Sequence, residues 1–317
     1  EDIKASTRVL AFDIFGTVVD WHGSIVREMQ TLYPSVDANA FALAWRAGYV
    51  PAMARVQSGK LGWTRIDELH RMILDDLLPQ FGLTHLNEAE RVHLNRVWHR
   101  LDAWPDSVAG LLRLKKKFTI CTLSNGNLGL LTNMAKHAGL PWDCVLSAEV
   151  FRAYKPDPAT YLGVANVFDL QPQEVMLCAA HHDDLAGARA CGLRTAYIER
   201  PLEFGASRVK DVSPQAGNDL HARDLNALAD LQQRLGADFR LRDGWISALE
   251  QAGGRRMEPR VAFRHPLLDR KFGVTSDAQV FTDDEIERLI EDYVVAARIL
   301  APYAERGAPT AQAYLGF

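Results

Sequence analysis

The feature that most constrains the fold of this chain is a series of short apolar runs, each followed by polar residues. Helix-like segments lie between these runs. Such runs are typical of buried strands, and glycines close the helix-like segments as they commonly close helices. The runs lie at residues 9–12, 119–123, 175–179 and 195–198, and two of the helix-like segments at 128–138 and 185–191. Strand, loop and helix in alternation indicate an α/β fold, a doubly wound parallel sheet with helices on both faces.

Two stretches break this alternation. Between residues 21 and 104 the sequence has helical periodicity and few strand-like runs, and after about residue 235 its character changes again. At 317 residues the chain is also longer than one typical domain. We therefore predict an α/β core formed by residues 1–20 and 105–235, an inserted helical cap over 21–104 and a C-terminal extension over 236–317.

The C-terminal extension suggests no role, but part of it is expected to be helical. Thr282 and Glu285 form a capping box, and an apolar stripe at helical spacing follows them. The stripe consists of Ile286, Leu289, Ile290, Tyr293, Val294 and Ala297. It predicts a helix over about 283–301 that is buried against its own chain or a second copy, which leaves a homodimer open.

Charge and composition narrow the class of protein. The net charge is −4 and the basic runs are short, so we expect no nucleic-acid partner and no membrane partner. No stretch reaches the roughly 18 apolar residues of a membrane span, and the first residues lack the pattern of a signal peptide. The four cysteines have no CxxC spacing and are interpreted as reduced thiols. We expect a soluble, cytoplasmic protein.

Polar side chains follow the ends of the predicted strands. Asp13 follows the first run, Ser124 and Asn125 follow the second, and the segment 181–184 follows the third, while Lys155 lies in a later loop. In an open parallel sheet the active site forms beyond the carboxyl ends of the strands. We therefore expect these side chains to meet in one site.

The same residues stand in four motifs. These are Asp13-Ile14-Phe15-Gly16-Thr17, Ser124-Asn125-Gly126, Lys155-Pro156-Asp157-Pro158 and Asp183-Asp184. In this order they resemble the four motifs of the haloacid dehalogenase superfamily, over roughly residues 8–205. The resemblance implies a haloacid-dehalogenase-like fold with an inserted cap. It also implies a carboxylate nucleophile, here Asp13, that attacks carbon or phosphorus to give an ester that water then hydrolyses.

The residue types suit that chemistry. A carboxylate nucleophile must stay charged in a partly dry pocket, and a nearby cation such as Lys155 keeps its pKa low. Thr17 and Ser124 are expected to hydrogen-bond the nucleophile or a substrate carboxylate. Taken alone, each of the two is more typical of a turn or a helix cap.

Phe15 bears on the subclass. Phosphatases of the superfamily resemble Asp-x-Asp at the first motif, where the second Asp serves as general acid to an alcohol leaving group. This chain has a phenyl ring there, and a halide leaves without needing a proton. The motif therefore resembles that of the L-2-haloacid dehalogenases, and we expect no metal and no cofactor. Core packing of Phe15 in an altered phosphatase stays open.

The predicted cap adds a second resemblance. Trp45-Arg46-Ala47-Gly48-Tyr49 resembles the cap segment whose Arg faces the nucleophile in those dehalogenases. Arg46 and Tyr49 are expected to share a helix face, and an Arg suits a carboxylate or a departing halide. Tyr161 likewise resembles a tyrosine of the dehalogenase pocket. A surface Arg and a core Tyr remain the plain alternatives.

The chain departs from the familiar dehalogenases at His181, where they carry Asn three residues before the last motif Asp. We expect a neutral imidazole near Asp184 that serves as base for the water that cleaves the ester. His182 is expected to face away or to pack. A metal site is disfavoured because four consecutive residues of an extended chain cannot all face one ion.

Four functions follow as hypotheses. The first is a 2-haloacid dehalogenase, with catalytic Asp13, Lys155, His181 and Asp184. Its substrate-binding residues would be Thr17, Arg46, Tyr49, Ser124, Asn125 and Tyr161, and its partner a small carboxylate. The others are an epoxide hydrolase on a small dicarboxylate, similar to cis-epoxysuccinate hydrolases, then a Mg²⁺-dependent phosphatase, and then an interaction protein on the same scaffold. The sequence leaves the substrate and the halide open.

Overall fold

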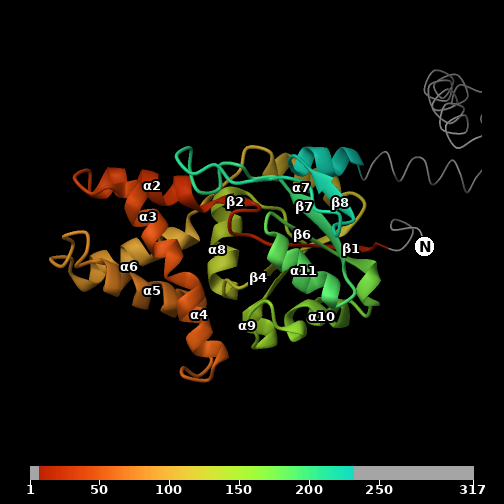
Figure 1. Cartoon of the computed structure of the whole chain (residues 1–317), viewed down its shortest axis with the longest axis horizontal. Coiled ribbons are helices and arrows are strands. Elements are labelled where there is room, and N and C mark those ends of the chain that lie inside the picture. The colour runs from red at the N-terminus through yellow and green to blue at the C-terminus, as the bar shows by residue number, and fades with distance from the viewer. Residues whose placement is uncertain (1–6, 232–317) are drawn as a thin grey trace, which may run out of the picture. The chain divides into compact units, whose positions relative to one another are not determined.

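A six-stranded parallel sheet organises the chain, for which the computed structural model describes residues 7–231. Its strands are β1 (Val9–Phe12), β4 (Thr119–Ser124), β5 (Cys144–Ser147), β6 (Val175–Ala179), β7 (Arg194–Ile198) and β8 (Leu220–Ala222). The order across the sheet is β5-β4-β1-β6-β7-β8, and every neighbouring pair is parallel (Figure 1). The chain builds outward from β1 to one side and then to the other, which confirms the predicted doubly wound α/β fold.

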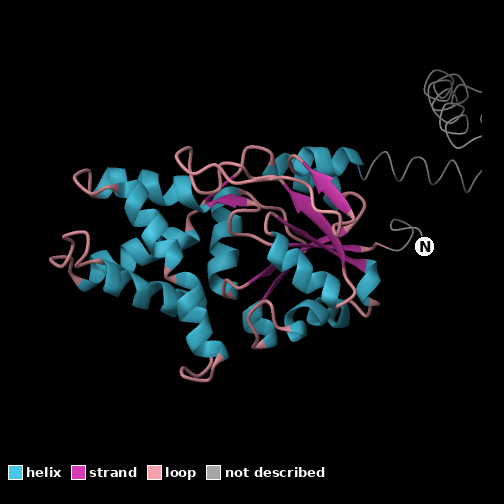
Figure 2. Cartoon of the chain, viewed as in Figure 1, coloured by secondary structure: helices cyan, strands magenta, loops and turns pink. Residues whose placement is uncertain are grey.

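Helices cover both faces of this sheet (Figure 2). They are α7 (Ser107–Lys115), α8 (Leu128–Ala138), α9 (Ala148–Phe151), α10 (Pro158–Val167) and α11 (His182–Ala190), with a 3₁₀ turn η2 (Pro172–Glu174). Leu10 and Phe12 pack into one buried cluster with α8, whereas Val9 and Ala11 pack into another with α10 and α11. Because side chains alternate between the faces of a strand, burial on both faces gives the unbroken apolar run.

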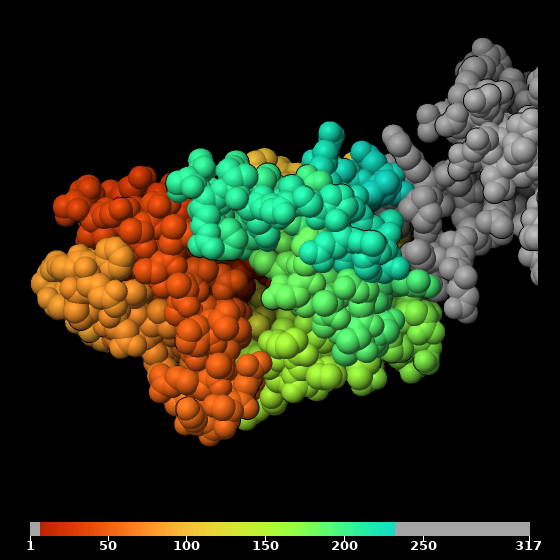
Figure 3. Space-filling view, viewed as in Figure 1, coloured from red at the N-terminus to blue at the C-terminus, as the bar shows by residue number. Residues whose placement is uncertain are grey.

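Helices make up the region between two short strands, β2 (Val19–Asp20) and β3 (Asp102–Ala103). They are α2 (Trp21–Leu32), α3 (Ala38–Ala47), α4 (Tyr49–Gln57), α5 (Ile66–Leu77), α6 (Glu88–Asn95) and a 3₁₀ turn η1 (Arg96–His99). β2 and β3 pair antiparallel, so the helical region leaves and rejoins the rest of the chain at one place. In the space-filling view it forms the red-to-orange part beside the green-to-cyan part (Figure 3). We retain the inserted cap over 21–104 as a proposal.

Several helix ends differ from those predicted. The single helix expected to carry Arg46 and Tyr49 is two helices, because α3 ends at Ala47 and α4 begins at Tyr49. Gly48 stands between them where a Cβ would lie 2.4 Å from Cγ2 of Ile73, so the close packing of α5 accounts for the glycine. By contrast, α8 spans 128–138 as predicted and ends at Gly139, whose φ of 68° is the left-handed conformation of a helix C-cap.

Other sequence predictions lie outside the described residues. These are the C-terminal extension over 236–317 and the helix over about 283–301, and both stay predictions. Among residues 7–231, no helix has the length and apolar character needed to cross a membrane.

Candidate active site

The tight turn after β1 places Asp13 at the carboxyl edge of the sheet. The Asp13 backbone N–H donates to the carbonyl of Cys178 on β6 at 3.0 Å, which extends the sheet pairing by one residue. Thr17 Oγ1 donates to Asp13 Oδ2 at 2.8 Å and accepts the Ala180 N–H at 2.9 Å. The Thr17 hydroxyl is thus held by the residue that follows β6 and is aimed at the carboxylate, which is one of the two partners expected for it.

Lys155 joins Asp13 to Asp184. Its Nζ lies 3.2 Å from Asp13 Oδ1 and 2.6 Å from Asp184 Oδ2, and the side chain is buried. The Lys155 backbone N–H donates to Asn125 Oδ1 at 2.9 Å, so the residue that follows β4 holds the lysine loop in place. The amide oxygen of Asn125 thus positions Lys155, and the substrate-binding role expected for Asn125 stays a prediction.

The Asp13 carboxyl is nearly enclosed, and its charge is stabilised by its neighbours. Burial acts to raise the pKa of Asp13, but the Lys155 ammonium, the His181 ring and the Thr17 hydroxyl together hold it well below its ordinary value. Asp13 is therefore ionised at neutral pH. A partly dry, ionised carboxylate at a strand end is suited to act as a nucleophile.

Asp184 lies on the first turn of α11 and has two donors. Tyr161 of α10 donates its hydroxyl to Asp184 Oδ1 at 2.8 Å, and Lys155 occupies Oδ2. Burial raises the pKa of Asp184, and the Asp13 charge adds to this while Lys155 opposes it. Tyr161 is fully buried and its hydroxyl holds Asp184, and the substrate-binding role expected for it stays a prediction.

His181 differs from the neutral ring expected near Asp184. Its Nδ1 lies 3.1 Å from Asp13 Oδ2 and its Nε2 lies 2.8 Å from Glu203 Oε1. Burial acts to lower the pKa of His181, but the two carboxylates outweigh burial and raise it to about 9. Both ring nitrogens then carry protons at neutral pH, and a ring in that state cannot accept a proton from water. The charge state of the ring therefore disfavours the expected role as base.

Residues 182–184 are also helical where the sequence predicted an extended chain. α11 begins at His182, three residues before the expected start, and His181 is its N-cap. His181 and Asp184 therefore project from the same helix end toward Asp13 and Lys155. His182 stacks on Tyr197 with ring centroids 4.0 Å apart, so it packs away from Asp13 as expected.

Glu203 was missed by the sequence analysis. It follows β7 and is fully buried, with Lys210 Nζ 2.6 Å from its second oxygen. Glu203 thereby extends the site into a row of alternating charges, each in contact with the next. The row runs Lys210, Glu203, His181, Asp13, Lys155, Asp184. The strand-end rule applied to the run 195–198 would have pointed to the segment 199–203.

Arg46 and Tyr49 are in contact, but not on one helix face as expected. Arg46 lies in the last turn of α3 and Tyr49 begins α4, and the guanidinium carbon lies 4.4 Å from the centre of the tyrosine ring. Arg46 Nε is buried without a hydrogen-bond partner among the described residues. Burial raises the pKa of Tyr49, Arg46 opposes this, and Asp13 adds to it. Tyr49 thus lies within electrostatic reach of Asp13, and Arg46 has an unused donor beside it.

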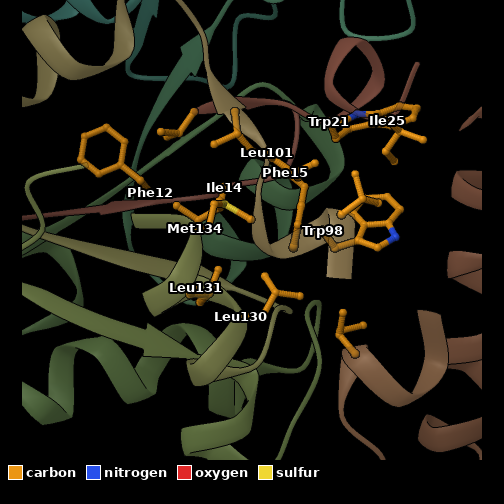
Figure 4. Packing of buried hydrophobic residues seen from close by; sticks show 14 of the residues in the cluster. Phe12, Ile14, Phe15, Trp21, Ile25, Trp98, Leu101, Leu130, Leu131 and Met134 are labelled. Atoms are coloured by element: carbon orange, nitrogen blue, oxygen red, sulfur yellow. The ribbon is translucent and has the colours of Figure 1, made fainter. Parts of the chain in front are cut away.

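Phe15 and Ser124 are the remaining motif residues. Phe15 is buried and points toward Trp98 of η1, with ring centroids 5.7 Å apart in an edge-to-face arrangement (Figure 4). It brings an apolar wall where an Asp-x-Asp motif would bring a second carboxylate. Ser124 is fully buried, and its Oγ accepts the Gly126 N–H at 3.1 Å, as a turn residue does.

Comparison with known proteins agrees with this geometry. The model of the haloacid dehalogenase-like hydrolase family matches residues 7–192. The chain is 28% identical to (S)-2-haloacid dehalogenase 1 of Pseudomonas sp. (strain CBS-3) over 72% of its own length and 96% of that protein.

Solved structures extend the similarity to the fold. The crystal structure of the L-2-haloacid dehalogenase PA0810 shares 46% identity at a TM-score of 0.68, with coverage of 71% of this chain and 99% of that one. The crystal structure of the defluorinating L-2-haloacid dehalogenase Rha0230 shares 44% identity at a TM-score of 0.69, with coverage of 72% of this chain and 95% of that one. The chain is an enzyme that belongs to the haloacid dehalogenase-like hydrolase family, in its L-2-haloacid dehalogenase branch.

Proposed function

We propose that this enzyme hydrolyses small 2-haloalkanoic acids to 2-hydroxy acids through an ester on Asp13. The observation that carries the proposal is the Asp13 carboxylate, which is held ionised by Lys155, His181 and Thr17 and faces no second carboxylate at the position of Phe15. The relatives named as 2-haloacid dehalogenases support the same substrate class.

In the first step, an oxygen of Asp13 attacks the α-carbon opposite the carbon–halogen bond. That bond breaks as the carbon–oxygen bond forms, the halide takes the bonding electrons, and the configuration inverts. Arg46, with its unpartnered Nε, binds the substrate carboxylate or the departing halide, as a guanidinium suits either anion. Tyr49 orients Arg46 through ring contact.

In the second step, water attacks Cγ of the Asp13 ester. We assign the proton acceptor to Asp184, because burial makes it a better base and Tyr161 and Lys155 fix its position. Lys155 lies between the two carboxylates and offsets the charge of each. No metal or cofactor enters either step.

A second candidate is the opening of an epoxide on a small dicarboxylate. The observation that favours it is the protonated His181, since an opened epoxide leaves an alkoxide that needs a proton, which a halide does not. A screen of 2-haloacids and cis-epoxydicarboxylates in the presence of EDTA, with halide and proton release measured, separates the two. Activity that survives EDTA would exclude the metal-dependent phosphatase.

The test of the mechanism is a single turnover in ¹⁸O-water. If Asp13 attacks carbon, the new hydroxyl carries an aspartate oxygen, and water enters at Cγ. The label should then appear in the Asp13 carboxylate and be absent from the first equivalent of hydroxy acid. Label in that first product, with no adduct on Asp13 by mass spectrometry, would show direct attack by water and reject the covalent proposal.

A further inference from the structure

We propose that the buried Glu203 is a positioning residue that keeps His181 cationic, so that His181 Nδ1–H and Thr17 Oγ1–H together stabilise negative charge on Asp13 Oδ2 during ester hydrolysis. Oδ1 is then the oxygen that bonds to substrate. The role in hydrolysis rests on the proposed ester intermediate, whereas the charge state of His181 does not.

The two oxygens of Asp13 are not equivalent. Oδ2 accepts from two donors, Thr17 Oγ1 at 2.8 Å and His181 Nδ1 at 3.1 Å, while Oδ1 has Lys155 Nζ at 3.2 Å. An oxygen with two short hydrogen bonds is the poorer nucleophile, which leaves Oδ1 to attack. In the ester, Oδ2 becomes the carbonyl oxygen and already faces the paired donors that an oxyanion requires.

The fold makes room for Glu203 at this point. Gly16, in the same turn as Asp13, has a φ of 85°, and a Cβ there would lie 2.3 Å from Glu203 Oε1. The neighbouring Arg200 donates its Nε–H to the Thr17 carbonyl at 2.8 Å and pairs with Asp106 through both terminal nitrogens. Glu203 is therefore clamped against the turn that carries the nucleophile.

Glu203 matters most after Asp13 has reacted. Among residues 7–231, the charged groups that face the His181 ring are Asp13 and Glu203, and Lys210 faces Glu203 from the other side. Once Asp13 is an ester it has no charge, so Glu203 is the anion that remains against the ring. Without it, burial would favour the neutral imidazole. The carboxylate thus preserves a cationic donor in the intermediate.

The hydrolytic step balances with these groups. The water oxygen bonds to Cγ, the C=O π pair moves to Oδ2 between His181 and Thr17, and the water proton passes to Asp184. When the carbonyl re-forms, the Cγ–Oδ1 bond breaks. Lys155, which contacts both Oδ1 and Asp184, donates a proton to Oδ1 and receives the one held by Asp184. The second proton of the water stays on the new Asp13 carboxyl and is then released to solvent, which regenerates the Asp13 carboxylate as the 2-hydroxy acid leaves.

The test compares Glu203→Gln with wild type in two measurements. ¹⁵N NMR of histidine-labelled enzyme without substrate should show both nitrogens of His181 protonated at pH 8 in wild type, and a titration at lower pH in the variant. Quench-flow with mass spectrometry on 2-chloropropionate should show ester hydrolysis slowed at least about tenfold, and ester formation changed much less. The Asp13 adduct should accumulate in the variant, and more as the pH rises.

A matched control is Glu199→Gln, which removes another carboxylate that bonds a histidine, His221, at 2.6 Å in the segment that follows β7. It should leave both measurements unchanged. If His181 of wild type is already neutral at pH 8, or if Glu203→Gln slows both steps equally at every pH, the inference is wrong.

The NMR arm on wild type decides the charge of His181 even if Glu203→Gln does not fold. If wild type forms no adduct and releases no halide while His181 is doubly protonated, the proposed function fails and the Glu203–His181 pairing stands. If wild type forms the adduct while His181 is neutral, the proposed function stands and the inference about Glu203 and His181 fails.

Discussion

Asp13 and Asp183 are two aspartates in different surroundings. Asp13 has three donors around it, whereas Asp183 is exposed on the first turn of α11. We expect Asp13→Asn to reduce kcat below about 1% of wild type, a loss of more than about 2.7 kcal/mol, because an amide is a poor nucleophile of nearly the same shape. Asp183→Asn should turn over at the wild-type rate. Turnover by Asp13→Asn above 1%, with a normal circular dichroism spectrum, would count against covalent catalysis.

Arg46 and Arg55 allow a similar comparison within the helical region. Arg46 has a buried Nε beside Tyr49 with no hydrogen-bond partner in the part of the chain that the structure describes, whereas Arg55 is exposed on the last turn of α4. Arg46→Ala should raise KM for a 2-haloacid and cost about 2–5 kcal/mol in kcat/KM, the range for a desolvated charge contact. Arg55→Ala should leave both constants unchanged. Equal kinetics for the two variants would place Arg46 outside the substrate site.

At the scale of residues, the sequence identified the positions that motifs mark and missed those that only tertiary packing brings in. Asp13, Lys155 and Asp184 follow from motif order and strand ends, and the structure places them in contact. Glu203 belongs to no motif, and its contact with His181 depends on how the segment after β7 folds back. That contact also changes the expected charge of His181. Burial lowers the pKa of the ring, but the second carboxylate, Glu203, helps Asp13 to raise it.

The turn between β1 and β2 is the element on which the site depends, and two glycines test it. Gly16 and Gly139 both have positive φ, but a Cβ at Gly139 would meet nothing within 4 Å while one at Gly16 would collide with Glu203. Gly139→Ala should cost about 1–2 kcal/mol of unfolding free energy from backbone strain alone. Gly16→Ala should cost clearly more in urea unfolding and should also slow ester hydrolysis. Equal costs would mean that Glu203 moves aside freely.

Elements with a strong local signal were predicted best. The ends of α8 were read correctly because Gly139 closes a regular apolar pattern. The break at Gly48 was not predicted, because it depends on packing against α5. The early start of α11 was not predicted either, because its N-cap, His181, gives little local signal of a helix. The sheet was predictable because each strand is buried on both faces and reads as an apolar run.

The stability of the whole molecule should depend on His181 in the alkaline range. Its folded pKa of about 9 lies above the ordinary 6.5, so the stabilisation is fully present below pH 6.5 and is lost as the pH rises through about 9. The expected loss is about 3 kcal/mol of unfolding free energy. The free energy of unfolding in urea is measured for wild type and for His181→Asn at pH 6 and pH 9.5. The difference between the two proteins at each pH isolates the contribution of His181 from those of other groups. A pH-independent difference would show that the ring is not stabilised as a cation.

The row of alternating charges from Lys210 to Asp184 is neutral as a whole when each carboxylate is ionised. Alkylation of Asp13 removes one negative charge from the middle of the row and leaves Lys155 and His181 on either side of an uncharged ester. The intermediate therefore carries a surplus positive charge in a place that water screens poorly. Ester cleavage restores the negative charge of Asp13 and makes the row neutral again. Relief of the surplus positive charge therefore contributes to the free energy that favours ester cleavage and return of the enzyme to its starting state.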